Sequence, residues 1–442
     1  MNIRDAKNYI EEFAKFGSKP GLERIQSLVS RLGHPEEKVR MIHVAGTNGK
    51  GSVCTYIYTI LNAAGIRTGC FTSPAVMEYR ERFRIAGRSV SQAALCRSLE
   101  TVKAAVDAML LDGEDSPTQF EVETALAFQL FADTDCEVAV IECGMGGELD
   151  STNVIRNPLA CVLTSISLDH MAVLGKSLDA ITRQKAGIIK QHSHVVTIEQ
   201  SPEVINVIKA KCSLEKADLT IIGRGEIANT KWGLRGSSFD YGKRKGLRIG
   251  LVGINQTDNA AIAVAAIDAL RKEHIKIDDE SIYKGLRESE WPGRFDIIAK
   301  KPMFILDGAH NEDAAKKLSE SVEYFLHNEE EAGKLILIMG VLADKNYDAV
   351  VKYMAPHGAH VITITPPDNP RALPALTLAE TVKKYNNMVS VAGSITEALE
   401  MAYLLADDQS VIIAFGSLSF LGEMRRQVES RGVVLRKKET KI

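Results

Sequence analysis

The chain is organised around a glycine-rich loop that follows its first apolar run. Residues 39–45 are mostly apolar, the loop at 46–52 reads GTNGKGS, and apolar residues with helical spacing begin at Val53. A loop between a strand and a helix presents backbone N–H groups and the positive end of the helix dipole, which together bind anions. Lys50 adds a full positive charge at the same place. The stretch therefore predicts a phosphate-binding loop within an α/β fold.

This loop departs from the ordinary phosphate-loop pattern. That pattern has four residues between its two glycines and places Ser or Thr directly after the lysine. Here two residues separate Gly46 from Gly49, and Gly51 stands between Lys50 and Ser52. We expect the loop to hold phosphate groups and Ser52 to reach a metal ion. The alternative is a glycine-rich turn that carries a solvent-exposed lysine.

The length of 442 residues exceeds what one hydrophobic core usually supports, so two domains are expected. The segment 291–295, WPGRF, interrupts the pattern of strands and helices and predicts the boundary, with one domain over residues 1–295 and a second over residues 296–442. Beyond this segment, short apolar runs alternate with helical patterns. The second domain is therefore also predicted to be α/β, without a phosphate loop of its own.

Composition narrows the class of protein. The chain has 54 basic and 57 acidic residues, and the basic ones are scattered apart from short runs at 243–245 and 436–438, so nucleic acid is not an expected partner. Seven cysteines form no CxxC pair, which fits buried thiols in a reducing compartment. Residues 1–12 resemble a charged amphipathic helix without a signal-peptide core, and no run of eighteen apolar residues occurs. A cytoplasmic location without membrane contact is expected.

Polar side chains stand at or after the ends of three further predicted strands. These side chains are Ser73, Glu142 and His170. Glu142 precedes a glycine-rich stretch, 143–147, where packing explains a carboxylate poorly, so metal binding is the better interpretation. Because the carboxyl ends of parallel strands meet at one edge of a sheet, all three are expected near Ser52. For His170, a satisfied core histidine is the common alternative.

Further candidate site residues lie along the chain, and for some of them a purely structural role is an equally plain explanation. Thr118 with Glu121 fits a capping box at a helix start, which we weigh evenly against a role in substrate binding. Lys185 fits a surface lysine on an amphipathic helix. Asn259, near the start of a helical run, carries an amide that could meet a nucleotide base. Asp307 follows an apolar strand of the second domain, in the polar sequence DGAHN.

Ten short motifs in one order resemble the folylpolyglutamate synthases. The resemblance includes the bifunctional bacterial form that also acts as dihydrofolate synthase, a branch of the Mur ligase superfamily, and it covers nearly the whole chain. The motifs are GTNGKGS at 46–52, SPxxxxxRER at 73–82, TxFE at 118–121, ECGxGG at 142–147, LDSTNV at 149–154, LDH at 168–170, KAGIIK at 185–190, WPGRF at 291–295, LDGAHN at 306–311 and GVLADKNY at 340–347.

The resemblance implies a fold and an activity. The fold would be a Mur-ligase-like ATP-binding domain over residues 1–295, followed by a Rossmann-like glutamate-ligase domain over residues 296–442. The activity would be ATP-dependent addition of L-glutamate to folate, and to dihydropteroate, through an acyl phosphate with release of ADP and phosphate. Its partners would be these small molecules together with Mg²⁺, in two sites, and the protein would be a monomer.

The resemblance also implies roles for individual residues. Catalysis would involve Lys50, His170 and Lys185. ATP would be bound by Gly49, Lys50, Gly51, Ser52, Asn259, Arg294 and Asp307. Metal ions would be held by Ser73, Glu142, His170 and Lys185, the last as a carbamylated lysine. The acceptor would be bound by Pro20, Gly21, Leu22, Thr118, Gln119, Phe120, Glu121, Leu149, Asp150 and Ser151. An imidazole is an unusual ligand for Mg²⁺, so the metal role of His170 rests on the resemblance alone.

Three departures from the family pattern leave the acceptor open. Ala75 stands in place of a usual His on the loop expected beside the acceptor cleft, Asn255 replaces another His, and Gln184 replaces a usual Glu. A related ligase with a different carboxylate acceptor is one alternative, and a non-catalytic nucleotide-binding protein is another. A muramyl-peptide ligase would need an additional N-terminal domain, for which the forty or so residues before the loop are too few.

Overall fold

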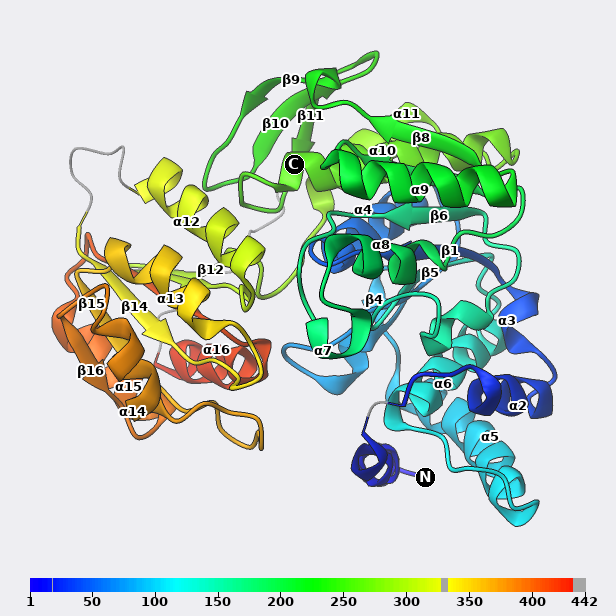
Figure 1. Cartoon of the computed structure of the whole chain (residues 1–442), viewed down its shortest axis with the longest axis horizontal. Helices are drawn as coiled ribbons and strands as arrows, with labels where there is room; N and C mark the ends of the chain where they lie inside the picture. The colour runs from blue at the N-terminus through cyan, green and yellow to red at the C-terminus, as the bar shows by residue number, and fades with distance from the viewer. Residues whose placement is uncertain (18, 327–332, 432–442) are drawn as a thin grey trace.

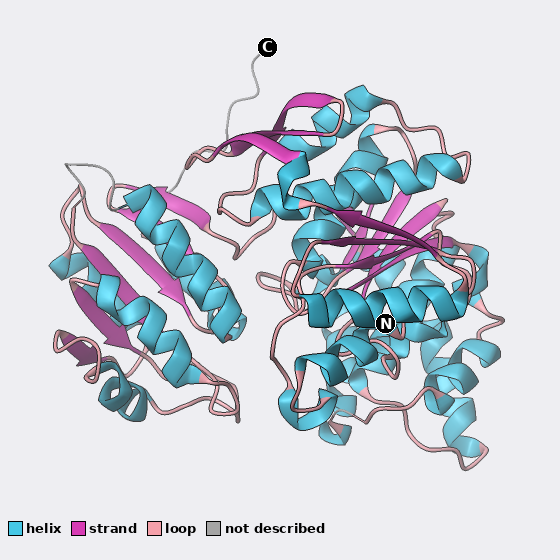
Figure 2. Ribbon diagram, turned by 45° about the horizontal axis from the view of Figure 1, so that its top comes forward, coloured by secondary structure: helices cyan, strands magenta, loops and turns pink. Residues whose placement is uncertain are grey.

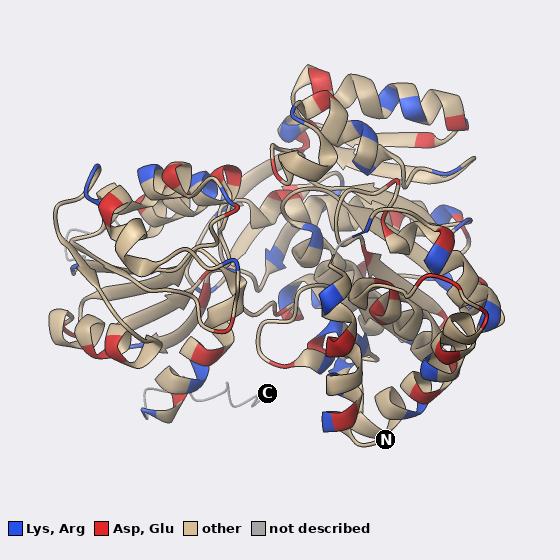
Figure 3. Ribbon diagram, turned by 60° about the horizontal axis from the view of Figure 1, so that its bottom comes forward, with Lys and Arg blue, Asp and Glu red and all other residues tan. Residues whose placement is uncertain are grey.

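The computed structural model describes residues 1–17, 19–326 and 333–431, so the basic run at 436–438 lies outside the described residues. The chain forms two α/β bodies, each built on its own sheet, with a small antiparallel sheet beside the first (Figure 1). Acidic and basic residues are interspersed along the helices of both bodies (Figure 3). No helix in the described part of the chain has the length and apolar character that a membrane crossing requires.

The first sheet has eight strands. Their spatial order is β4 (Arg88–Ser89), β3 (Phe83–Ile85), β2 (Thr68–Phe71), β5 (Val138–Glu142), β1 (Arg40–Ala45), β6 (Ala160–Leu163), β7 (His194–Ile198) and β8 (Asp218–Ile222). The six strands from β2 to β8 in this order run parallel, and β3 and β4 add an antiparallel edge. Because both faces of such a sheet are covered, its central strands are apolar nearly throughout.

Helices cover both faces of the first sheet (Figure 2). One face packs against α4 (Lys50–Ala63), α10 (Gln256–Lys272) and α11 (Asp279–Glu288). The other face packs against α1 (Ile3–Glu11), α2 (Glu23–Arg31), α5 (Gln92–Leu111), α6 (Gln119–Asp133), α8 (Leu178–Ala186) and α9 (Pro202–Glu215). The short helices α3 (Pro35–Lys38) and α7 (Met171–Leu174) lie in connections. The small antiparallel sheet consists of β9 (Ile227–Lys231), β10 (Ser237–Tyr241) and β11 (Arg244–Ile249).

The second sheet has six strands. Their order is β12 (Asp296–Lys300), β13 (Met303–Leu306), β17 (Val411–Phe415), β14 (Leu335–Met339), β15 (His360–Thr363) and β16 (Val389–Val391). All pairs are parallel except β12 with β13. On one face lie α12 (Glu312–Leu326), α13 (Tyr347–Met354) and α14 (Ala375–Val382), and on the other α15 (Ile395–Leu405) and α16 (Leu421–Ser430). A domain boundary at 295/296 would fall just before β12 and stays a prediction.

Two segments depart from what their residue types alone suggest. The apolar run that begins at Ala160 includes Ile166, but β6 ends at Leu163, because the following residues bond to the glycine-rich loop instead: the Ser165 carbonyl accepts from the N–H of Thr47, and the Thr164 hydroxyl donates to the Asn48 carbonyl. The charged stretch 78–84 is not an irregular loop, because it turns through a 3-10 helix and then begins β3. Phe83 is fully buried there, so the apolar ring rather than the flanking charges decides the conformation.

His43 in the middle of β1 makes stability depend on pH. Its side chain has no exposure, and burial, with a smaller effect from Lys190, lowers its pKa from 6.5 to about 3. The unfolded chain therefore binds a proton that the folded chain does not between pH 6.5 and about 3, so stability falls as pH falls through this window. We expect the contribution of His43 to the free energy of unfolding to drop by about 2 kcal/mol between pH 7 and pH 5. Urea unfolding of the wild type and His43→Gln at both pH values measures it, and equal pH dependence in the two proteins would contradict the assignment.

Candidate active site

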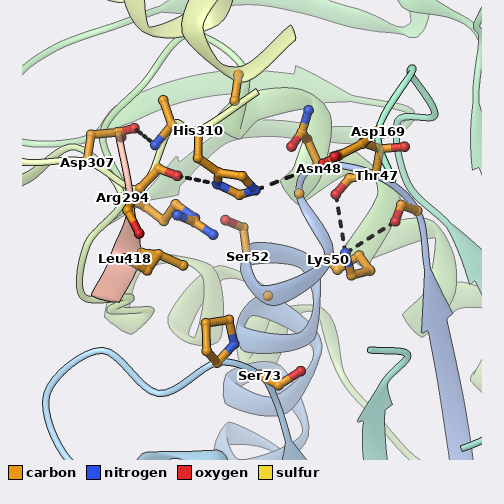
Figure 4. Close-up of a pocket in the computed structure, with 18 of the residues that line it drawn as sticks. Thr47, Asn48, Lys50, Ser52, Ser73, Asp169, Arg294, Asp307, His310 and Leu418 are labelled. Carbon is orange, nitrogen blue, oxygen red and sulfur yellow. Dashed lines mark hydrogen bonds and ion pairs between the residues drawn. The ribbon is translucent and has the colours of Figure 1, made fainter. Parts of the chain in front are cut away.

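A cavity of about 510 Å³ lies where the carboxyl ends of the two parallel sheets face each other. We call it the loop cavity, because the glycine-rich loop 46–52 forms one of its walls (Figure 4). The opposite wall comes from the second body and includes His310 and Leu418. Most of the predicted ATP and metal residues meet in it: Gly49, Lys50, Gly51, Ser52, Ser73, Glu142, His170, Lys185, Arg294 and Asp307.

Close packing explains the unusual spacing of the glycines in the loop. Gly49, with φ 87°, caps α4, and a Cβ atom there would lie 2.5 Å from Oδ1 of Asn259. A Cβ atom on Gly51 would lie 2.7 Å from the ring of Trp291. The glycine inserted between Lys50 and Ser52 is therefore needed because the indole covers the loop. The WPGRF segment contacts the phosphate loop directly, which the sequence did not indicate.

Lys50 and Glu142 form the charged centre of the loop cavity. Nζ of Lys50 donates to the carbonyls of Gly46 and Thr47, at 3.2 Å each, and lies 4.0 Å from Oε1 of Glu142. Glu142 is almost fully buried, and its Oε2 accepts from the N–H of Ser73 at 3.2 Å. Burial raises the pKa of Glu142, while Lys50 opposes the rise. A buried carboxylate whose charge is only partly matched by the protein attracts a further cation.

Lys185 is a buried cavity lysine, not a surface lysine of an amphipathic helix. It is 4% exposed, and its Nζ donates to the carbonyl of Gly46 at 2.8 Å. Burial, and after it the charge of Lys50, lowers the pKa of Lys185 to about 7. A substantial fraction of the amine is therefore neutral at physiological pH, which the spacing of the helix did not reveal.

Asp307 anchors the second body at the cavity. Its Oδ1 and Oδ2 accept the N–H groups of Ala309 and Phe295, at 2.8 Å each, so both carboxylate oxygens already have a backbone donor. Burial raises the pKa of Asp307, and the guanidinium of Arg294 opposes the rise. Nδ1 of His310 donates to the Gly308 carbonyl at 2.7 Å, and burial lowers the pKa of His310 to about 4. The neutral His310 imidazole thus has its Nε2 atom unprotonated in the loop cavity.

A set of polar contacts joins the two bodies next to the loop, and no sequence pattern pointed to it. Oδ1 of Asp169 pairs with Nζ of Lys345 at 2.7 Å, and its Oδ2 accepts from Asn311 at 2.9 Å. Against the effect of burial, His170 and Lys345 hold the pKa of Asp169 below its usual range. Asn311 also exchanges side-chain hydrogen bonds with Asn48 of the loop. The motifs LDH, GVLADKNY and LDGAHN contain these residues, but only the tertiary structure pairs them.

His170 lies in the loop cavity but is less buried than a core histidine. Its side chain is 40% exposed, and its Nε2 lies 3.9 Å from Oδ2 of Asp169. Burial lowers the pKa of His170, so the neutral ring, which can act as a ligand, is favoured. With φ 50° it begins α7 in the left-handed region. His170 lines the same cavity as Glu142 and Ser52, as expected for residues at strand ends, and its role stays a prediction.

A second cavity, of about 600 Å³, adjoins the first, and we call it the side cavity. It brings together most of the residues predicted for the acceptor: Pro20, Gly21, Thr118, Gln119, Phe120, Glu121, Leu149, Asp150 and Ser151. The two cavities share part of their walls, namely Ser73, Pro74, Gly144 and Met145. Substrates bound in the two cavities would therefore meet beside these residues.

The Thr118–Glu121 capping box is present at the start of α6. Oε2 of Glu121 accepts the N–H and hydroxyl of Thr118, at 2.7 and 2.8 Å, and also Nε of Arg24 at 3.1 Å. This oxygen is therefore used by the protein. Glu123, two residues further along, pairs with Arg82, and both side chains line the side cavity. Neither residue was a predicted site residue. Phe120 supplies an apolar wall and stacks on Phe71 with ring centres 5.8 Å apart.

Several predicted residues lie elsewhere. In the described part of the chain, Leu22 and Asn259 line neither cavity. Nδ2 of Asn259 donates to Gln256, which in turn donates to Oγ of Ser52 at 3.4 Å. Asn259 is therefore connected to the glycine-rich loop through Gln256. Ala75, expected beside the acceptor, lines the loop cavity, as does Asn255. Gln184 lines the side cavity, where its Nε2 donates to Glu148 at 3.3 Å.

The donor set can hold a hard divalent cation. The buried carboxylate of Glu142 and the hydroxyls of Ser52 and Ser73 are the oxygen ligands that Mg²⁺ prefers, and all three line the loop cavity. The neutral imidazole of His170 is tolerated but not preferred. The unmodified ammonium of Lys185 does not fit a cation site, whereas a carboxylate-like adduct on its neutral amine would.

Known proteins resemble this chain in both α/β bodies. Residues 44–267 match the Mur ligase middle domain, and residues 293–418 match the Mur ligase glutamate ligase domain. A dihydrofolate synthase/folylpolyglutamate synthase of Bacillus subtilis is 34% identical over 96% of this chain and 99% of its own length. The Mycobacterium tuberculosis folylpolyglutamate synthase complexed with ADP superposes with a TM-score of 0.88 at 29% identity, over 96% of this chain and 98% of that one. An Escherichia coli FolC in complex with DHPP and ADP gives 0.84 at 27% identity, over 98% and 99%.

The two matching family models, over residues 44–267 and 293–418, cover the strands of both large sheets apart from the first part of β1. Relatives that share about a third of their residues with this chain over nearly their full length share its fold. This chain is therefore a member of the Mur ligase superfamily and, within it, of the folylpolyglutamate synthase/dihydrofolate synthase family.

Proposed function

We propose that this protein is an ATP-dependent ligase that joins L-glutamate by an amide bond to the carboxylate of a folate, and also to that of dihydropteroate. The observation that carries the proposal is the shared wall of the two cavities. Ser73, Pro74, Gly144 and Met145 line both, so a carboxylate held in the side cavity can approach a phosphate held by the loop. A protein that only bound nucleotide would have no need of the adjoining cavity.

The chemistry follows from the weakness of a carboxylate as an electrophile. In the first step an oxygen of the acceptor carboxylate attacks the γ-phosphorus of ATP, the bond to the β,γ-bridging oxygen breaks, and ADP leaves. In the second step the amine of glutamate attacks the acyl carbon, phosphate leaves, and the nitrogen loses a proton. Both steps concentrate negative charge, which Lys50 and the N–H groups at the start of α4 stabilise.

Residues from both bodies are proposed to bind ATP. Arg294, from the junction, and Asp307, from the end of β13, are proposed to contact the nucleotide. Asp307 is suited to a ribose hydroxyl because its oxygens are already oriented by backbone donors. Since both residues lie across the cavity from Lys50, ATP would be bound fully only when the two bodies are in contact. Asn259 would act on the phosphates through Gly49 and Ser52 rather than on the base.

Mg²⁺ is proposed as the cofactor, at two positions. Bound cations would neutralise the oxygens of the phosphate groups and polarise the γ-phosphorus. Glu142, Ser73 and His170 would hold one ion with Ser52 nearby, and a carbamylated Lys185 would contribute to the second. Lys50 and Lys185 repel an unscreened cation, so the modification of Lys185 matters for the second position.

We also propose that the protein is a cytoplasmic monomer. All seven cysteines are buried and free, which suits a reducing compartment. Both cavities are formed within one chain, so a single copy has all the residues proposed for the reaction. Light scattering of the purified protein measures the oligomeric state.

The deciding experiment is glutamate-dependent ADP release with a panel of acceptors. Dihydropteroate and tetrahydrofolate are expected to stimulate release, and a UDP-muramyl peptide is not. ADP release with some other carboxylate alone would support the ligase chemistry but show that the acceptor is not a folate or dihydropteroate. No release with any acceptor would leave a nucleotide-binding protein.

A further inference from the structure

His43 is a polar side chain at the centre of the first sheet. On the same face of β1, Met41 packs with α5 and α6 and Ala45 packs with α8 and α9. His43 lies between these two apolar clusters and has no exposure. A residue there that served packing alone would be apolar.

A chain of hydrogen bonds leads from this ring to the side cavity. Nε2 of His43 lies 2.8 Å from Oγ1 of Thr152, and the Thr152 hydroxyl donates to Oδ1 of Asp150 at 2.5 Å. Because the single hydroxyl proton is used on Asp150, Oγ1 must accept, and Nε2 of His43 must carry the donated proton. The bond therefore fixes one tautomer of the imidazole.

The other ring nitrogen, Nδ1, is left unpaired by this arrangement in the described part of the chain, and that lowers the stability of the fold. Nδ1 of His43 is buried without a hydrogen-bond partner among the described residues. An unpaired buried acceptor lowers stability, and an aliphatic side chain would avoid the loss. The ring also stays neutral, because burial lowers its pKa far below physiological pH. His43 therefore places a neutral Nε2–H donor at a position where packing alone would favour an aliphatic side chain.

This series of hydrogen bonds ends on the loop after β5, part of which lines both cavities. Oδ2 of Asp150 accepts the N–H of Met145 at 2.8 Å, and Oδ1 also accepts the N–H of Thr152 at 3.0 Å. Asp150 lines the side cavity, and Met145 lines both cavities. With three donors already on its carboxylate, Asp150 acts mainly as the anchor of this loop.

We propose that His43 is a positioning residue for the acceptor: through Thr152 it orients Asp150, and Asp150 holds the loop after β5 against the side cavity. The inference rests on the proposed function, because it assigns the side cavity to the acceptor. His43 itself touches neither cavity in the described part of the chain. Because Asp150 lines the side cavity and not the loop cavity, the effect of His43 should fall mainly on acceptor binding and leave ATP binding nearly unchanged.

The test compares His43→Gln with His43→Asn. The glutamine amide nitrogen can reach the position of Nε2, whereas the asparagine nitrogen reaches only that of Nδ1, so the two variants are matched in polarity and differ in the donated bond. We expect His43→Asn to raise the KM for the acceptor about tenfold, as for one lost buried hydrogen bond, with the KM for ATP within about twofold of wild type. His43→Gln should restore the acceptor KM to within about threefold of wild type.

A second pair covers the case in which His43→Asn does not fold. Thr152→Ser keeps the hydroxyl and Thr152→Val removes it without changing the shape, so only the valine variant should raise the acceptor KM. Equal acceptor KM values within both pairs, or equal increases in the KM for acceptor and for ATP, would overturn the proposal. If the wild type itself shows no acceptor-dependent ADP release, the proposed function fails instead. Nitrogen NMR of the imidazoles gives a readout without activity: one neutral Nε2–H signal, absent in His43→Gln, should not titrate between pH 8 and pH 5.

Discussion

Lys50→Met is expected to lower glutamate-dependent ADP release at least about a hundredfold, the usual loss when a preorganised charge at a developing negative centre is removed. Methionine keeps the length of the side chain and removes the charge 4.0 Å from Glu142. Glu142→Gln should have an effect of similar size, because the amide still accepts the N–H of Ser73 but no longer attracts a cation. Steady-state release of ADP under saturating acceptor measures both losses.

The double variant Lys50→Met/Glu142→Gln separates chemistry from stability. Each single substitution leaves a buried group without its opposite charge and lowers the melting temperature, whereas the double variant removes both charges and should regain part of that stability. Its activity should remain as low as that of the weaker single variant. Turnover near the wild-type rate in any of the three proteins would refute the assignment of the charged centre.

Lys185→Ala is expected to lose nearly all activity, because a carbamylated lysine would supply an oxygen ligand to the second metal ion. The modification requires the neutral amine, and with a pKa of about 7 the amine of Lys185 becomes mostly neutral as pH rises from 6 to 8. Activity in bicarbonate buffer should therefore rise over this interval and saturate above it. Mass spectrometry under mild conditions should detect an added 44 Da, the mass of CO₂.

Chemical rescue distinguishes a ligand role from a structural one. Acetate or formate at high concentration should restore part of the activity of Lys185→Ala, since a small carboxylate can occupy the space left by the side chain. Lys190→Ala is a matched control from the same KAGIIK motif, since Lys190 lines neither cavity in the described residues, and carboxylates should not stimulate it. If Lys185→Ala ligates at the parental rate in carbonate-free buffer, other groups hold the second metal ion.

Regular local patterns made much of the fold predictable. Helices α5, α12, α13 and α15 and strands β13, β14 and β17 have the bounds that their patterns predict. The helices repeat apolar residues every three or four positions, and the strands are short apolar runs, so local spacing alone indicates where each element begins and ends. The glycine-rich loop between β1 and α4 and the meeting of polar residues from several strand ends were also predictable, because parallel strands must present their carboxyl ends at one edge.

Burial and long-range contacts decided the rest. The lowered pKa of Lys185, the indole of Trp291 above Gly51 and the pairing of Asp169 with Lys345 all depend on neighbours more than a hundred residues away. The same is true of His43 and Thr152, which meet only when β1 and the loop after β5 are packed together. Periodicity shows which face of an element is buried. The groups that meet a polar side chain on that face, and so its charge and hydrogen bonds, depend on the packing of segments from the whole chain.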